Sequence, residues 1–293
     1  MADENSENSR FNLLPEGCIA NIISFTSPKD ACTAAAVSVG LKSAAESDTV
    51  WERFLPPDYV EIVSGSSSPV AAYSTKKELF FSLCDSPLLV DGGKLSLRLD
   101  KSTGKKCYML CSRQFQIAWG DNLMYWTWSS LPDSRFAEVA ELQSVFWLGM
   151  RAIFQAELLS PNTNYAAYLV FKLMEDHEGL DCPSKASIKF VREKNGSVIE
   201  KVDKTISNVY IVPRVMGRRR RIRRTRGGLP GTTPNDRVSR VRSDGWLEIE
   251  LGDFFICEGD KFDIQIDVSE TKHLNWKRGL IIEGIELRPK EVS

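Results

Sequence analysis

Residues that commonly carry catalysis are few in this 293-residue sequence, and they lie far apart. The two histidines, His177 and His273, sit neither in a helical pair nor beside cysteines with the spacing of metal ligands. Segment 103–106 (Thr-Gly-Lys-Lys) lacks the flanking residues of a phosphate-binding loop. Cys107 and Cys111 lie in a strand-like stretch, where residues four apart are separated by about 13 Å. We therefore expect no catalytic residue, no metal site and no cofactor.

Aromatic side chains are the other group with binding chemistry, and they are concentrated in one stretch. Three of the seven tryptophans lie within ten residues, Trp119, Trp126 and Trp128, and Tyr125 stands among them. The C–H faces of a pyranose ring pack well against Trp or Tyr, while carboxylates and amides can fix its hydroxyls. The alternative is that these rings belong to a core. For Trp119 and Trp246 we favour the core, because tryptophan is usually buried.

The elements that position these residues begin with a short helical module. Apolar residues follow a Leu-Pro pair at helical i, i+3, i+4 spacing and predict a first helix: Leu14, Pro15, Ile19, Ile22 and Ile23. Ser27 and Pro28 start a second helix, predicted to run to residue 39, and residues 47–55 predict a third that stops at Pro56. Three short helices bury little surface, so we expect a partner to complete their core.

After the module the pattern becomes that of a β protein. Residues 75–78 fit a capping box and predict one helix ending near 85–87. Beyond Gly93, apolar residues alternate with polar ones and predict half-buried strands over 95–99, 115–119, 247–251 and 262–268. Residues 165–173 and 280–287 are continuously apolar, as in central strands. We predict an α+β fold, with helices over 11–57, a linker with a short helix over 58–93, and an antiparallel, jelly-roll-like β-sandwich over 94–290.

The N-terminal module resembles the F-box in its order of Leu-Pro, isoleucine-rich helix, Ser-Pro-Lys-Asp helix start and tryptophan-bearing last helix. F-box modules dock on the small Skp-type adaptor of cullin-based ubiquitin ligases. The resemblance implies that the contact is made by these residues: Leu14, Pro15, Ile19, Ile22, Ile23, Val37 and Trp51. The alternative is that they are core positions of a helical cap on the β domain.

The β region resembles the phloem protein 2 lectin family of plants. Its motifs occur in the family's order over about 190 residues: 101–110, 119–128, 139–142, 159–165, 245–252 and 279–289. An F-box before this domain matches the F-box subgroup of that family. The resemblance implies a lectin-type sandwich that recognises N-acetylglucosamine oligomers or N-glycan cores without catalysis. Combined with the aromatic chemistry, it gives five candidate carbohydrate-binding residues: Trp119, Tyr125, Trp126, Glu248 and Glu283.

Residues 214–226 contain eight arginines and no acid, and the glycine-rich residues up to 231 extend them into a long loop. The basic candidates are Arg218, Arg219, Arg220, Arg221, Arg223 and Arg224. Such a run must be solvated or paired with acid. Three interpretations stay open: a nuclear import signal, a phosphate or nucleic-acid patch, and a solvated loop without a dedicated partner.

Overall composition limits the classes of function. A net charge of -1 and a pI near 6.2 argue against a protein devoted to nucleic acid. The acidic N-terminus lacks a secretory signal, no long apolar run suits a membrane, and seven scattered cysteines fit reduced thiols, so we expect a cytoplasmic and nuclear protein. Two classes remain. The chain is either a ubiquitin-ligase subunit that selects glycosylated or other protein targets, or an intracellular lectin or interaction module that acts without the ligase.

Overall fold

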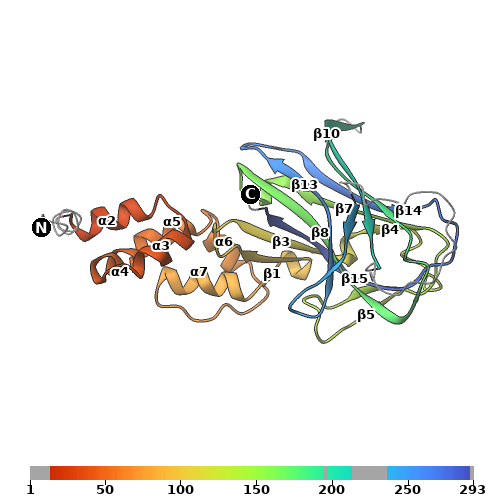
Figure 1. The fold of residues 1–293 in the computed structure, drawn as a ribbon, viewed down its shortest axis with the longest axis horizontal. Coiled ribbons are helices and arrows are strands. Elements are labelled where there is room, and N and C mark those ends of the chain that lie inside the picture. Colours follow the sequence, from red (N-terminus) through yellow and green to blue (C-terminus); the bar gives the residue numbers. More distant parts are fainter. Residues whose placement is uncertain (1–13, 195–196, 213–235, 291–293) are drawn as a thin grey trace, which may run out of the picture. The chain divides into compact units, whose positions relative to one another are not determined.

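A computed structural model describes residues 14–194, 197–212 and 236–290 of the chain (Figure 1). The chain divides into two compact units. The smaller comprises Met1–Gly92 and Ser96–Cys107, and the larger comprises Gly93–Leu95 and Tyr108–Ser293. None of the described helices is long and apolar enough to cross a membrane.

The smaller unit is mainly helical. Its helices are α2 (Glu16–Ile23), α3 (Pro28–Ala35), α4 (Val39–Glu46), α5 (Asp48–Phe54), α6 (Tyr59–Ser64) and α7 (Lys76–Asp85), followed by the strands β1 (Leu88–Val90) and β2 (Leu95–Leu99). The predicted helix over 28–39 is wrong. The first of two helices in this region ends at Ala35. The Ser38 hydroxyl then accepts a hydrogen bond from the Leu41 N–H and starts a separate helix, α4.

The core of the smaller unit is built around Trp51 of α5. This side chain is 1% exposed, its indole N–H donates to the Ala45 carbonyl at 2.7 Å, and its ring packs 5.2 Å from that of Phe80. Phe80 belongs to α7, where the predicted capping box of Thr75 and Glu78 is confirmed. The chain's own α7 therefore covers the helices that we expected a partner to complete.

The larger unit consists of two antiparallel-rich sheets, as predicted. In the first sheet, neighbouring strands follow the order β3 (Lys106–Cys111), β15 (Arg278–Pro289), β8 (Thr163–Glu178), β13 (Leu247–Ile256) and β12 (Arg240–Val241). In addition, β6 (Val139–Leu142) pairs with β15, and β5 (Trp126–Ser129) pairs with β6. The second runs β11 (Asp236–Val238), β10 (Ser197–Tyr210), β9 (Ser184–Lys194), β14 (Asp263–Glu270), β7 (Leu148–Gln155) and β4 (Gln116–Ile117). β10 and β11 pair in parallel.

The two sheets pack face to face as a sandwich. Tyr108 of β3 lies 5.5 Å from Phe154 of β7, and Phe190 of β9 lies 5.9 Å from Phe254 of β13, between ring centroids. The continuously apolar segments are confirmed as central strands, β8 and β15. The fold is α+β.

Two strand predictions need correction. The predicted strand over 115–119 is only the two-residue β4, because the backbone leaves the sheet and reaches a positive φ of 59° at Trp119. The β13 strand is not half-buried as its alternation suggested, because Glu248 is also covered, with 3% of its surface exposed.

Candidate functional site

The candidate adaptor-binding residues of the smaller unit fall into two groups. Leu14, Ile22 and Val37 are 40%, 48% and 69% exposed, and Pro15 is also exposed. The other three are buried in the unit's own core, in one cluster with residues of α4, α5 and α7: Ile19, Ile23 and Trp51. The first group can touch another protein directly, whereas the second holds the helices that carry the first.

Two further apolar side chains on this unit were not singled out from the sequence. Phe25, just after α2, is 66% exposed, and Val39, the first residue of α4, is 86% exposed. The guanidinium of Arg53 lies 3.9 Å from the Phe25 ring centroid. The sequence did contain a sign of Phe25: it follows Ile22 by three residues, a spacing that places two residues on the same side of a helix. Val39 was missed because the break between α3 and α4 was missed.

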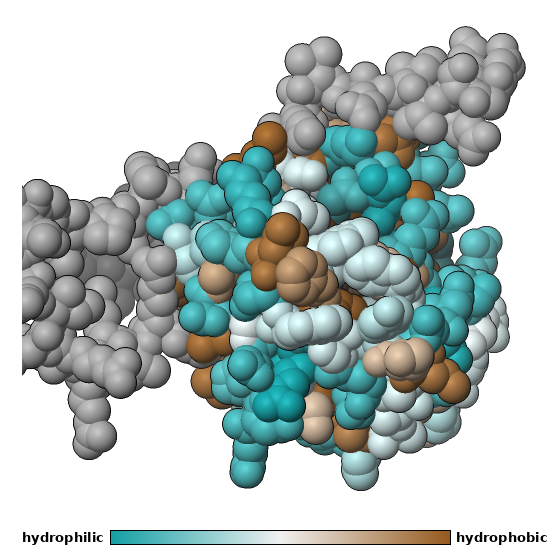
Figure 2. All heavy atoms as spheres, turned by 90° about the vertical axis from the view of Figure 1, so that its right-hand side faces the viewer, coloured by the Kyte–Doolittle hydropathy of each residue, from teal (hydrophilic) through white to brown (hydrophobic). Residues whose placement is uncertain are grey.

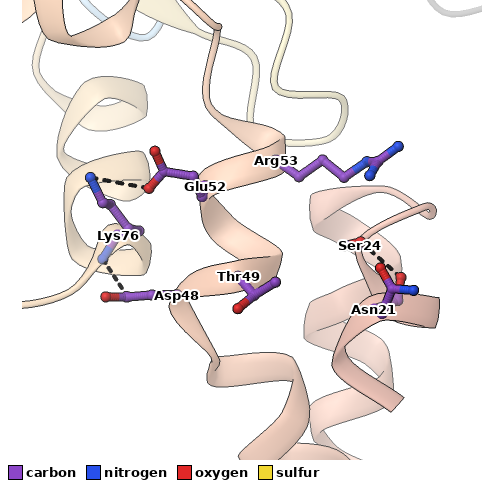
Figure 3. A pocket seen from close by; sticks show the side chains of 7 residues that line it. All are labelled: Asn21, Ser24, Asp48, Thr49, Glu52, Arg53 and Lys76. Atoms are coloured by element: carbon purple, nitrogen blue, oxygen red, sulfur yellow. Dashed lines mark hydrogen bonds and ion pairs between the residues drawn. The ribbon is translucent and has the colours of Figure 1, made fainter. Parts of the chain in front are cut away.

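A polar groove of about 560 Å³ lies beside α2 and α5 (Figure 3). Its lining residues are Asn21, Ser24, Asp48, Thr49, Glu52, Arg53 and Lys76. The Asp48 carboxylate accepts the backbone N–H of Lys76 at 2.8 Å, and the Lys76 ammonium lies 3.1 Å from Glu52. Hydrogen bonding to Tyr59 raises the pKa of Lys76 and lowers that of Glu52. These contacts of Asp48 and Glu52 with Lys76 link α5 to the start of α7, so we assign them a structural role.

In the larger unit, an aromatic cluster forms around Trp119. The Trp119 ring lies 5.5 Å from Tyr125 and 4.5 Å from Trp147, between centroids, and Trp119 is 41% exposed. A hydrogen-bonded loop presents it, in which the Asn122 amide oxygen accepts the Met124 N–H at 3.0 Å. The core interpretation is therefore wrong for Trp119. Trp147 was not a candidate, because an isolated tryptophan ahead of an alternating strand gives no sign of its neighbours.

Trp126 and Trp246 are interior residues, each 1% exposed. The Trp126 indole donates to the Ala118 carbonyl at 3.2 Å, next to Trp119 in the chain. The Trp246 indole donates to the Asp133 carbonyl at 3.1 Å, and the predicted burial of Trp246 is confirmed. Trp126 thus supports the loop that carries Trp119 and presents no surface to a ligand in this structure.

The two candidate carboxylates are also buried. Glu283 is 1% exposed and accepts the Arg135 backbone N–H at 2.8 Å, and burial raises its pKa. Glu248 accepts hydrogen bonds from Arg240, Arg242 and Arg288 at 2.6, 2.8 and 2.9 Å. Burial alone would raise the pKa of Glu248, but the hydrogen bond and positive charge of Arg288 outweigh it and lower the pKa. Both carboxylates have structural partners, so the structure joins only Trp119 and Tyr125 from the predicted set.

Metal chemistry and the basic segment add no further site to this description. In the residues that the structure describes, no group of three or more His, Cys, Asp or Glu side chains is arranged to hold a metal ion. Cys107 and Cys111 are both buried. The arginine candidates between residues 218 and 224 lie outside the described residues.

Comparison with known proteins identifies both parts of the chain. The F-box domain model matches residues 11–53, and the Phloem protein 2 model matches residues 105–289. Among relatives from Arabidopsis thaliana, F-box protein At2g02240 is 43% identical over 96% of this chain and 81% of its own length. F-box protein PP2-B10 is 40% identical over 98% of this chain and 97% of its own length. The chain therefore belongs to the phloem protein 2 family, in the group that carries an N-terminal F-box.

Proposed function

We propose that this protein is the substrate-recognition subunit of a Skp-cullin-F-box ubiquitin ligase. The observation that carries the proposal is the concentration of exposed large apolar side chains in the part matched as an F-box: Leu14, Ile22, Phe25, Val37 and Val39. Exposed apolar groups gathered on a small unit are typical of a protein-binding surface. Their partner is the Skp-type adaptor and, through it, the cullin.

The β-sandwich would select the target. Trp119 and Tyr125 present exposed or half-buried rings, on which the C–H face of a pyranose can lie. We propose N-acetylglucosamine oligomers or N-glycan cores as the ligand, and glycosylated proteins as the substrates. The subunit performs no chemistry of its own. It accelerates ubiquitin transfer by holding the target close to the charged conjugating enzyme, in the cytoplasm and nucleus.

A second function is favoured by one specific observation. The smaller unit fills its core with its own α7, through Leu79, Phe80 and Leu83, and so has no interior left for a partner to complete. A lectin or interaction module that keeps this helical unit and never engages the ligase would have the same structure. Binding to the adaptor separates the two functions.

The test measures the affinity of the full-length chain for a purified Skp-type adaptor. Replacing Leu14 and Ile22 together by alanine removes exposed apolar surface and leaves the core intact, so the variant is expected to bind about 10- to 100-fold more weakly. Val60→Ala is the matched control, because Val60 is 60% exposed on α6, outside the residues matched as an F-box. If the parent chain shows no affinity for the adaptor, the ligase function is refuted and the second function stands.

A further inference from the structure

A groove of about 380 Å³ lies on the outer face of the second sheet, where β4, β7 and β14 run side by side. The strand register places Gln116, Arg151 and Asp267 in one row across these strands, and Gly149 and Ser269 in the next. All five line the groove. The volume falls within the range of about 300 to 1000 Å³ that is typical of small-ligand sites.

One wall of the groove is Trp147, and this ring connects the groove to the aromatic cluster. A Cβ atom at residue 149 would come within 2.8 Å of the Trp147 ring, so the glycine makes room for the ring to lie against the sheet. The ring centroid of Trp147 lies 4.5 Å from that of Trp119. The aromatic surface is therefore continuous from the exposed Trp119 into the groove. Figure 2 shows one face of the larger unit, on which hydrophobic and intermediate residues are exposed among hydrophilic ones.

The polar side of the groove is held in place before any ligand arrives. The Asp267 carboxylate accepts one hydrogen bond from Arg151 Nε at 2.6 Å and another from Gln265 Nε2 at 2.7 Å. Gln265 is only 5% exposed, which fixes this end of the network. The bond to Asp267 uses the Nε–H of Arg151, and the guanidinium carries further N–H donors in the same plane. Fixed carboxylate and guanidinium groups can bind the hydroxyls of a ligand without reorganising.

The charges in the groove select against ionic ligands. Among the described lining residues, the charged side chains are Arg151 and Asp267, and they neutralise each other. A phosphate or carboxylate ligand would have to displace Asp267 from Arg151, and a cationic ligand would meet the guanidinium. A neutral ligand with one apolar face and several hydroxyl or amide groups suits the site best. That description fits a pyranose ring.

We propose that this groove is a second sugar subsite, which binds one pyranose ring of an oligosaccharide while a neighbouring ring lies on Trp119 and Tyr125. The face of the first ring packs on Trp147, and its polar groups bind Gln116, Arg151 and Asp267. The inference rests on the proposed glycan binding and makes it more specific: the ligand is a linked, uncharged oligosaccharide that spans two subsites.

The test is calorimetric titration of the full-length chain with chitotriose, three linked N-acetylglucosamine units. Arg151→Gln and Asp267→Asn are expected to weaken binding at least tenfold, and Gln116→Ala, on the exposed strand β4, tests the same groove independently. Arg278→Gln is the matched control, since the Arg278 side chain is 49% exposed against 46% for Arg151 and pairs with Glu178 at 3.4 Å, outside the groove lining. Its affinity is expected to equal that of the parent.

Two contrary results have different meanings. If the groove variants bind chitotriose like the parent while Trp119→Ala loses binding, the second subsite is refuted and the proposed glycan binding stands. If the parent binds no chitotriose, both the subsite and the glycan part of the proposed function are refuted. Adaptor binding then still decides the ligase part, because it is measured on the other unit.

Discussion

Replacing Glu270 by glutamine is expected to lower the free energy of unfolding of the larger unit by about 3 kcal/mol at pH 7. Glu270 ends β14, and its side chain is 2% exposed. It forms an ion pair of 2.6 Å with Lys277, whose side chain is 1% exposed, and it accepts the backbone N–H groups of Lys272 and His273 at 2.9 and 2.8 Å. Glutamine keeps an acceptor for those two groups but leaves the Lys277 ammonium buried without its counter-charge.

The magnitude follows from the carboxyl's pKa. Burial alone would raise the pKa of Glu270, but hydrogen bonds from Lys277 and His273 outweigh burial and hold the pKa at about 2, against an ordinary value of 4.5. Each pKa unit corresponds to about 1.4 kcal/mol, which gives about 3 kcal/mol for the ionised group. Removing one partner of a buried ion pair typically costs about 3 to 5 kcal/mol, in agreement with this value.

The sign of the pH dependence is fixed by the lowered pKa. A carboxyl whose pKa is lower in the folded state stabilises that state above the unfolded pKa, and the stabilisation is lost as the pH falls toward 2. The difference between parent and Glu270→Gln should therefore shrink from about 3 kcal/mol at pH 7 to about 1 kcal/mol at pH 3.

Hydrogen exchange of peptides covering residues 263–289 measures this difference within the larger unit, independently of how the smaller unit unfolds. The control is Glu178→Gln, since Glu178 is 68% exposed in its pair with Arg278 and should change stability by less than about 1 kcal/mol. A Glu270→Gln effect below about 1 kcal/mol at pH 7, or one that is equal at pH 7 and pH 3, would refute the reasoning.

Three further predictions concern single side chains. Thr75→Ala removes the capping hydroxyl of α7 and should cost about 1 kcal/mol in urea unfolding of the smaller unit, with chitotriose affinity unchanged. Burial raises the pKa of the Cys84 thiol to about 12, so iodoacetamide at pH 8 should modify the exposed Cys18 quickly and leave Cys84 unmodified in the native chain, as mass spectrometry of peptides can show. Trp126→Ala should destabilise the larger unit by about 3 to 5 kcal/mol, whereas Trp119→Ala should lose chitotriose binding with little loss of stability, so equal thermal shifts in the two variants would contradict the assignment.

Local signals predicted the elements that depend on neighbouring residues. The capping box at Thr75 and Glu78 set the start of α7, and continuous apolar runs identified β8 and β15 as central strands. The failures occurred where the backbone changes direction. A serine that caps a new helix, Ser38, looks the same in sequence as a serine inside a helix. The alternation that ends at Trp119 likewise contains no sign of the positive φ that takes this residue out of the sheet.

Burial of charged residues could not be predicted from the strand pattern. Glu248 occupies the polar side of an alternating strand, which normally faces water. In the structure three arginines cover it, and Arg288 comes from β15, forty residues further along the chain. Glu283 is covered because a distant loop places the backbone N–H of Arg135 against it. In both cases the partner is brought by tertiary structure, so residue type alone suggested a ligand carboxylate where the protein has an internal one.

The candidate sugar site could also be predicted from the sequence only in part. Gly149 and Arg151 alternate with buried residues along β7, which is enough to place both on one outward face, and Trp147 directly precedes this strand. What makes that face a groove is the register with β14 and β4, which brings Asp267 and Gln116 opposite Arg151. Asp267 is more than a hundred residues away in sequence, and no local rule sets its register. An aromatic cluster can thus be suspected from composition, but the polar groups that would give it selectivity come from strand pairing.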